Sequence, residues 1–272
     1  GAPGTNCTDI GNLAPTTDFG AIVQGVNDNV DAIVSGHTHL LYNCSFPVPG
    51  WSGRPVTERP VVSAGQYGTN LNKLVFTVDT ATGEVQAKTQ TVLPLKSCAN
   101  STACTNYPVD APTQTIVDAA VAQSDVLGAV PLGQIAGPFK RGKIADGTTE
   151  NRGAESTLGN LVAEVQKWAT RNPESGSAQL AFMNPGGLRA DMVGTGTGAF
   201  PRTLTYKQAA VVQPFANTLV NMDLTGAQIK ATLEQQWQPG GASRPFLKLG
   251  ISKGFTYTYD PGAAQGSRIT GM

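Results

Sequence analysis

Long hydrophobic runs, charged residues and histidines are all scarce in this sequence of 272 residues. No stretch approaches the roughly 18 consecutive apolar residues of a membrane-spanning helix, so the sequence predicts no transmembrane segment. Charged residues make up 14% of the chain, against about 25% in an average soluble domain. Lys+Arg and Asp+Glu number 19 each, which leaves no basic excess for binding nucleic acid or an anionic membrane surface.

The four cysteines form no Cys-x-x-Cys pair, which argues against a zinc ribbon or a thioredoxin motif. An even cysteine count with few charges favours disulfides and a secreted, periplasmic or cell-surface protein. Cys98 and Cys104 flank a short polar stretch, so we expect them to close that loop and to leave Cys7 and Cys44 as a second pair. The alternative is that the cysteines are reduced and buried.

Hydrophobic spacing predicts an α/β fold, α+β in part. Residues 18–28, 110–127 and 158–168 have helical spacing, and a capping box at residues 225–228 begins another predicted helix. Predicted strands cover residues 31–34, 74–78, 179–183, 219–224 and 255–259. We therefore expect a first domain at 1–109, a linker helix at 110–127 and a second domain at 128–272.

The two histidines of the chain, His37 and His39, directly follow the predicted buried strand at 31–34. In an extended segment, residues two apart point the same way, so both imidazoles can face one metal ion or a pair of ions. The alternative is a pair of surface loop histidines. Residues 31–39 (Asp-Ala-Ile-Val-Ser-Gly-His-Thr-His) resemble the last metal-binding motif of calcineurin-like metallophosphoesterases, and residues 63–68 resemble the segment that follows it in the 5′-nucleotidase branch.

This resemblance implies a centre of two divalent metal ions, zinc, manganese or similar, that generates a hydroxide nucleophile and clamps a phosphoryl group. His37 and His39 would each bind one ion. The earlier family motifs that supply the other ligands do not occur in this sequence. We therefore expect a fragment of a longer enzyme that binds metal weakly or not at all, and that carries no catalytic residues beyond these two metal ligands.

A second resemblance covers roughly residues 128–272. Residues 155–161 (Glu-Ser-Thr-Leu-Gly-Asn-Leu), 184–189 (Asn-Pro-Gly-Gly-Leu-Arg), 204–206 (Leu-Thr-Tyr) and 212–217 (Val-Gln-Pro-Phe-Ala-Asn) resemble ordered motifs in the C-terminal domain of secreted 5′-nucleotidases. The family's later segment, which supplies a second base-stacking aromatic, does not occur here. The resemblance implies a nucleotide substrate and the following substrate-binding residues: Arg152, Asn184, Gly186, Gly187, Arg189, Phe215 and Asn217.

The chemistry of these residues suits a nucleotide. Arginine forks bind phosphate in a bidentate manner, and an aromatic ring stacks on a base. Each residue also has a structural alternative: Arg152 and Arg189 as surface ion-pair partners, Asn184 as a turn former, and Phe215 as a core residue. Pro185 replaces the family's first loop glycine and favours an extended Asn184.

The sequence thus predicts a metal-dependent hydrolase of nucleotide phosphoesters, of the 5′-nucleotidase type. The alternatives are a non-catalytic nucleotide-binding module, or a UDP-sugar or 2′,3′-cyclic nucleotide specificity. The sequence leaves the oligomeric state open.

Overall fold

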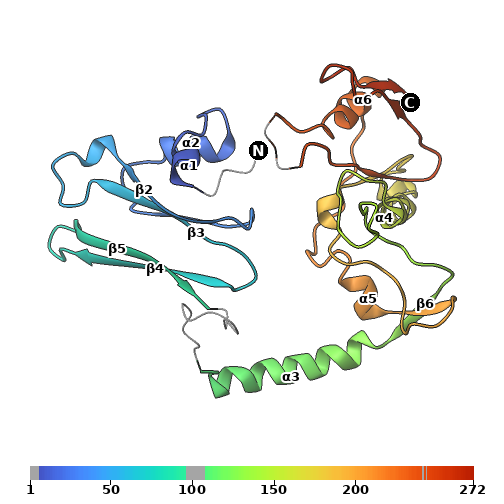
Figure 1. The fold of residues 1–272 in the computed structure, drawn as a ribbon, viewed down its shortest axis with the longest axis horizontal. Coiled ribbons are helices and arrows are strands. Elements are labelled where there is room, and N and C mark those ends of the chain that lie inside the picture. The colour runs from blue at the N-terminus through green and yellow to red at the C-terminus, as the bar shows by residue number, and fades with distance from the viewer. Residues whose placement is uncertain (1–5, 96–107, 241, 243) are drawn as a thin grey trace. The chain divides into compact units, whose positions relative to one another are not determined.

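The computed structural model describes residues 6–95, 108–240, 242 and 244–272. They fall into two compact units, residues 1–110 and 111–272, and each is described by itself (Figure 1). The predicted Cys98–Cys104 disulfide lies outside the described residues. No helix in the described ranges is long and apolar enough to cross a membrane. The mixture of helices and small sheets confirms the predicted α/β class.

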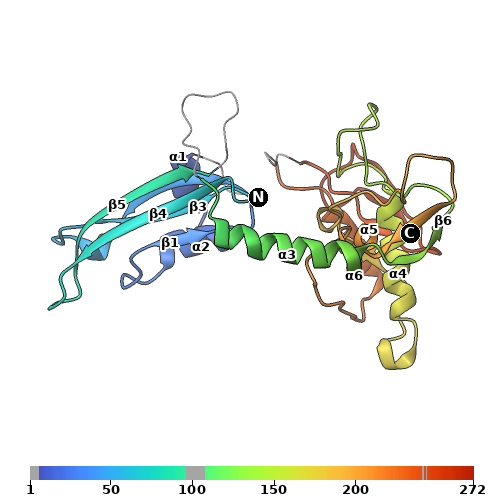
Figure 2. The ribbon, with the colours of Figure 1, turned by 90° about the horizontal axis from the view of Figure 1, so that it is seen from below.

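In its described residues, the first unit contains two short helices and five strands. Its elements are α1 (Cys7–Gly11), α2 (Asp18–Gly25), β1 (Ile33–Ser35), β2 (Leu41–Pro47), the 3-10 turn η1 (Pro49–Trp51), β3 (Glu58–Ala64), β4 (Asn70–Val78) and β5 (Val85–Pro94). Strand β3 lies between β1, which runs parallel to it, and β2, which runs antiparallel. Strands β4 and β5 form a separate antiparallel hairpin, seen as the long ribbon pair in Figure 2.

The core of the first unit lies between its helices and the β1-β3-β2 sheet. Ile10 of α1 and Val23 of α2 pack with Ile33, Tyr42 and Val61 from the three strands. A disulfide joins the start of α1 to the middle of β2, with its Cα atoms 5.4 Å apart. It is the predicted pair Cys7–Cys44, which the structure confirms.

The part of the second unit that the structure describes contains four helices and several two-stranded pairings. Its elements are α3 (Ala111–Gly128), β6 (Pro131–Ile135), α4 (Thr157–Ala169), η2 (Pro173–Ser175), β7 (Phe182–Met183), η3 (Pro185–Gly187), β8 (Arg202–Thr205), α5 (Tyr206–Ala210), α6 (Gly226–Glu234), β9 (Gly250–Ile251), β10 (Thr258–Tyr259) and β11 (Ile269–Gly271). Strand β6 pairs with β8, β7 with β9, and β10 with β11, all antiparallel.

Helix α4 is the central element of the second unit. Ser156 caps it by accepting the N–H of Gly159 at 2.8 Å. Its buried face packs on β6, β7 and the loop after β7 through Leu158 and Val162. Helix α4 approaches β9 so closely that a Cβ atom at Gly250 would overlap the backbone of Gly159. Strand β9 in turn pairs with β7, which the loop at residues 184–189 follows.

All three predicted strands of the second unit differ from the structure. The strand predicted at 179–183 is limited to β7. The prediction for residues 219–224 is wrong, because this described segment contains no strand and pairs with none of the strands that the structure describes. The strand predicted at 255–259 is limited to β10. Phe255 instead packs its ring edge-on against Phe182, with centroids 5.6 Å apart. The capping box of Thr225 and Gln228 at the start of α6 is confirmed.

Candidate functional site

The histidine loop of the first unit directly follows β1, as predicted, but its backbone is not extended. His37 and His39 have φ angles of 67° and 63°, and the Thr38 N–H donates to the Gly36 carbonyl at 2.8 Å. The argument that both imidazoles share one side of an extended segment is therefore wrong. Both histidines are exposed, and the ring of His39 meets Tyr67 edge-on at a centroid distance of 5.2 Å.

Metal binding by this loop stays a prediction. Within the described residues, no group of three or more His, Cys, Asp or Glu side chains is arranged to hold a metal ion. The two histidines can each donate one nitrogen, but a two-metal centre needs several more ligands. The residues that the structure describes therefore do not fit a complete dinuclear centre.

The glycine-containing loop of the second unit, residues 184–189, begins directly after β7. Asn184 is extended, with φ −66° and ψ 127°, as expected for a residue before proline. Its side-chain oxygen accepts the N–H of Gly186 at 3.3 Å, so Asn184 is a turn former. The side chain is also exposed, and the turn leaves it at the surface of the loop, where it can meet a ligand.

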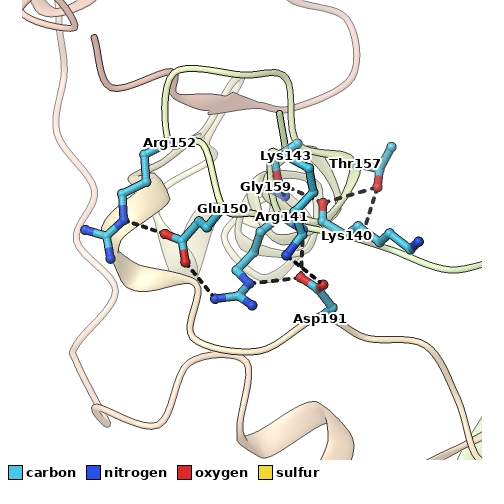
Figure 3. Close-up of polar contacts among 9 residues, drawn as sticks. Lys140, Arg141, Lys143, Glu150, Arg152, Thr157, Gly159 and Asp191 are labelled. Atoms are coloured by element: carbon cyan, nitrogen blue, oxygen red, sulfur yellow. Dashed lines mark hydrogen bonds and ion pairs between the residues drawn. The ribbon is translucent and has the colours of Figure 1, made fainter. Parts of the chain in front are cut away.

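Arg152 lies beside this loop and is held by a carboxylate (Figure 3). Its Nε donates to Glu150 Oε1 at 2.7 Å. Its Nη1 lies 3.4 Å from the position that a Cβ atom would take at Gly186. The ion-pair alternative for Arg152 is therefore confirmed, and the guanidinium also reaches the predicted binding loop.

Glu150 belongs to a larger ionic cluster that also contains Arg141, Asp191 and Lys143 (Figure 3). Arg141 donates through Nη1 to Glu150 Oε2 and through Nε to Asp191 Oδ1, both at 2.9 Å. Lys143 Nζ lies 3.3 Å from Asp191 Oδ2. These side chains are 15–30% exposed, so solvent screens the cluster only in part.

The carboxyl groups of the cluster are held in their charged form. Burial alone would raise the pKa of Glu150, but the hydrogen bond from Arg152 and the charges of Arg152, Arg141 and Arg244 lower that pKa below its ordinary value. Burial likewise acts to raise the pKa of Asp191, and hydrogen bonds from Arg141 and Lys143 more than offset it. Both carboxylates are therefore ionised at neutral pH.

Arg189 and Phe215 come together at the other end of the loop. The Arg189 N–H donates to the carbonyl of Val212 at 2.8 Å, which ties the loop to the segment that carries Phe215. The Arg189 guanidinium carbon lies 5.7 Å from the centroid of the Phe215 ring. Phe215 is 50% exposed, so the core alternative for this residue is wrong. Asn217, two residues further on, is exposed.

The structure thus brings together most of the predicted substrate-binding residues in pairs. Arg152 meets Gly186, and Phe215 meets Arg189. Gly186 and Arg189 lie on one short loop, which also contains Asn184 and Gly187. An exposed aromatic ring and two guanidinium groups suit a ligand with a flat ring and an anionic group. Sequence reasoning missed the ionic cluster. A carboxylate two residues before Arg152 was the available signal for Glu150, whereas Asp191 and Arg141 are 50 residues apart and gave none.

Comparison with known proteins identifies the class. Residues 131–272 match the family described as 5′-nucleotidase, C-terminal domain. This match covers more than half of the chain and contains every predicted substrate-binding residue. The chain therefore belongs to the 5′-nucleotidase C-terminal domain family.

Two of the curated relatives that match the chain carry nucleotidase or nucleotide phosphoesterase names, and a third is named a cell wall protein. The chain is 29% identical over 241 residues to the trifunctional nucleotide phosphoesterase protein YfkN of Bacillus subtilis, covering 86% of the chain and 14% of that protein. It is 24% identical over 258 residues to a probable 5′-nucleotidase of Treponema pallidum, covering 80% of the chain and 42% of that protein. A cell wall protein of Listeria monocytogenes is 26% identical over 240 residues, which is 86% of the chain and 27% of that protein. The chain thus spans less than half the length of each of these relatives.

Proposed function

We propose that the second unit binds a nucleotide and that the chain is part of a metal-dependent, 5′-nucleotidase-type hydrolase of phosphoric esters. The observation that carries the proposal is the half-exposed Phe215 ring beside the Arg189 guanidinium, on a loop within the family match. Stacking of a base on an aromatic ring contributes about 1–3 kcal/mol and tolerates different bases. A nucleotide is the ligand class that uses both the ring and the cations.

Each residue has a defined role in this proposal. Arg152 and Arg189 bind the phosphate, because planar guanidinium groups match its geometry. Phe215 stacks on the base, and Asn217 hydrogen-bonds the base or the ribose. Asn184 contacts the polar part of the ligand. Gly186 and Gly187 allow the ligand to approach the backbone, since neither carries a side chain.

The family resemblance is the basis for proposing a metal centre in the parent enzyme. Two metal ions would supply a hydroxide nucleophile and neutralise phosphoryl charge, and His37 and His39 would contribute one ligand each. The described residues do not complete such a centre, so we derive no catalytic step from them. We also propose a secreted or cell-surface location, which the cell wall relative and the Cys7–Cys44 disulfide support.

Binding of adenosine 5′-monophosphate and of adenosine tests the proposal. Arg189→Ala should weaken the monophosphate about tenfold or more and leave adenosine within about twofold, because a charge-assisted phosphate contact is lost. Arg171→Ala is the matched control, since Arg171 lies in the same unit and its guanidinium covers Trp168 at 4.2 Å. Equal losses for both ligands, or no binding by the wild-type chain, would contradict the proposed function.

A non-catalytic nucleotide-binding role is the second candidate for this chain. The small number of metal-binding side chains favours this role. Among the described residues, the predicted metal site has two histidines, and no group of three or more His, Cys, Asp or Glu side chains is arranged to hold a metal ion. We expect the 272-residue chain to bind adenosine 5′-monophosphate without hydrolysing it when Mn²⁺ or Zn²⁺ is added. Phosphate release at a steady, metal-dependent rate would instead show that the chain is catalytically complete.

A further inference from the structure

The ionic cluster beside the binding loop points to a positioning residue that the family resemblance did not include. We propose that Glu150 holds the Arg152 guanidinium through Nε, so that its two terminal nitrogens are presented to a phosphate at the glycine-containing loop. This inference rests on the proposed function for the identity of the ligand. The hold itself is a property of the unliganded protein and can be measured separately.

The first argument is the way in which Arg152 is bound. In the described part of the chain, its side chain is hydrogen-bonded through Nε alone, to Glu150 Oε1 at 2.7 Å. A guanidinium has five N–H donors in a fixed plane. A carboxylate on Nε fixes that plane and leaves the paired Nη1 and Nη2 donors for a second anion. These two terminal nitrogens form one of the planar forks with which an arginine binds phosphate in a bidentate manner.

The second argument is that Glu150 is itself fixed. Its other oxygen accepts from Arg141 Nη1 at 2.9 Å. Arg141 is anchored by Asp191, which accepts from both the backbone N–H and the Nε of Arg141, at 3.0 and 2.9 Å. Lys143 binds the second oxygen of Asp191. An exposed ion pair is mobile, whereas this chain of contacts gives Glu150 a defined orientation that it can pass to Arg152.

The third argument is that the Arg152 guanidinium lies close to Gly186. Arg152 Nη1 lies 3.4 Å from the position that a Cβ atom would take at residue 186, and the side-chain nitrogen Nδ2 of Asn184 lies 3.3 Å from the same point. The Arg152 guanidinium therefore lies in van der Waals reach of the point where a side chain at residue 186 would begin. The residues that line a small pocket here include Arg141, Glu150, Arg152 and Pro185.

Removal of the Glu150 charge should change the affinity for an anion in opposite directions under the two explanations, positioning and simple electrostatics. Removal of the negative charge of Glu150 makes the pocket more positive, so electrostatics alone would strengthen the binding of an anion. Removal of a positioning group would weaken it, because the guanidinium must then be ordered by the ligand. Glu150→Gln tests this directly, since it keeps the size of the side chain and removes its charge.

We would titrate wild-type, Glu150→Gln and Asp125→Asn chains with adenosine 5′-monophosphate and with adenosine. Asp125→Asn is the matched control, because it removes the same charge from an exposed ion pair with Lys207 in the same unit. We expect Glu150→Gln to weaken the monophosphate about five- to tenfold and to leave adenosine within about twofold. Unchanged or tighter binding of the monophosphate by Glu150→Gln would overturn the proposal.

Nitrogen-15 NMR of arginine Nε–H groups measures the hold without any nucleotide. We expect a slowly exchanging Nε–H signal that disappears in Arg152→Lys and exchanges faster in Glu150→Gln but not in Asp125→Asn. Absence of such a signal from the wild-type chain would overturn the proposal. A protected signal in a chain that does not bind the monophosphate would support the hold and refute the proposed function, so the two failures are distinguishable.

Discussion

Replacement of Phe215 by alanine separates a ligand-stacking role from a structural one. Full burial of a phenylalanine side chain stabilises a fold by about 1.5–3 kcal/mol, and Phe215 is 50% exposed. Its packing therefore contributes about 1–1.5 kcal/mol by the same measure. The contact with the Arg189 guanidinium at 5.7 Å adds about 0.5–1 kcal/mol at an exposed site. The free energy of unfolding should thus fall by about 2 kcal/mol.

The expected effect on binding is similar in size to the effect on folding. Loss of base stacking costs about 1–3 kcal/mol, which weakens binding about 5- to 150-fold. We would measure it by titration with adenosine 5′-monophosphate below the melting temperature of the variant. Phe215→Trp keeps a flat ring and should retain most of the affinity, because the stacking surface is preserved.

Leu233→Ala is the structural control for this experiment. Leu233 is fully buried in the cluster around α6, and its truncation should cost about 2–5 kcal/mol of stability. That variant should melt earlier than Phe215→Ala and bind the monophosphate normally when folded. A Phe215→Ala chain that binds as tightly as the wild type would refute the stacking role. A chain that unfolds as Leu233→Ala does would show that the ring belongs to the core.

Three further predictions concern stability. Ser156→Ala should lower the free energy of unfolding in urea by about 1 kcal/mol, since the hydroxyl caps α4 through Gly159; an unchanged midpoint would argue against this cap. The Cys7–Cys44 disulfide spans 37 residues, and a chain-entropy model gives about 4 kcal/mol for a loop of that length. A double alanine variant in which the first unit melts at the wild-type temperature would contradict that estimate. The lowered pKa of Glu150 stabilises the fold above the ordinary glutamate pKa, and this contribution is lost as the pH falls through the lower folded value. The difference in melting temperature between wild type and Glu150→Gln should therefore shrink below about pH 4; a difference that grows there would reverse the sign.

Elements with a strong local signal were predictable from the sequence. The helical spacing at 158–168 corresponds to α4, and the capping box identified the start of α6. Alternating apolar residues also predicted part of β4. That strand pairs with β5, which follows it after a short turn, so the local pattern was sufficient. The segment at 219–224 shows the limit of this reasoning. Its apolar residues favour a strand, but a strand also needs a partner, and sequence alone does not specify one.

The sequence predicted those residues of the candidate site whose own side-chain chemistry suits a nucleotide. It did not predict contacts between residues that are far apart in the sequence. Arginines and an aromatic ring at motif positions identified the loop, and Pro185 predicted the extended Asn184. The structure excludes the core alternative for Phe215, whose ring is half-exposed. The left-handed backbone of His37 and His39 was missed, because φ is positive in few residues other than glycine.

The close approach of α4 to β9 changes what the motif at residues 155–161 means. A glycine in a signature segment is readily interpreted as a point of ligand contact. Gly159, however, faces the backbone of Gly250: a methyl group at Gly250 would overlap the Gly159 backbone, and one at Gly159 would come within 3.3 Å of the Gly250 Cα. Selection at these two sites would therefore act on the spacing between a helix and a strand. A search that recognises distant members of the family by Gly159 detects a shared scaffold, and it carries no information on which nucleotide a member accepts.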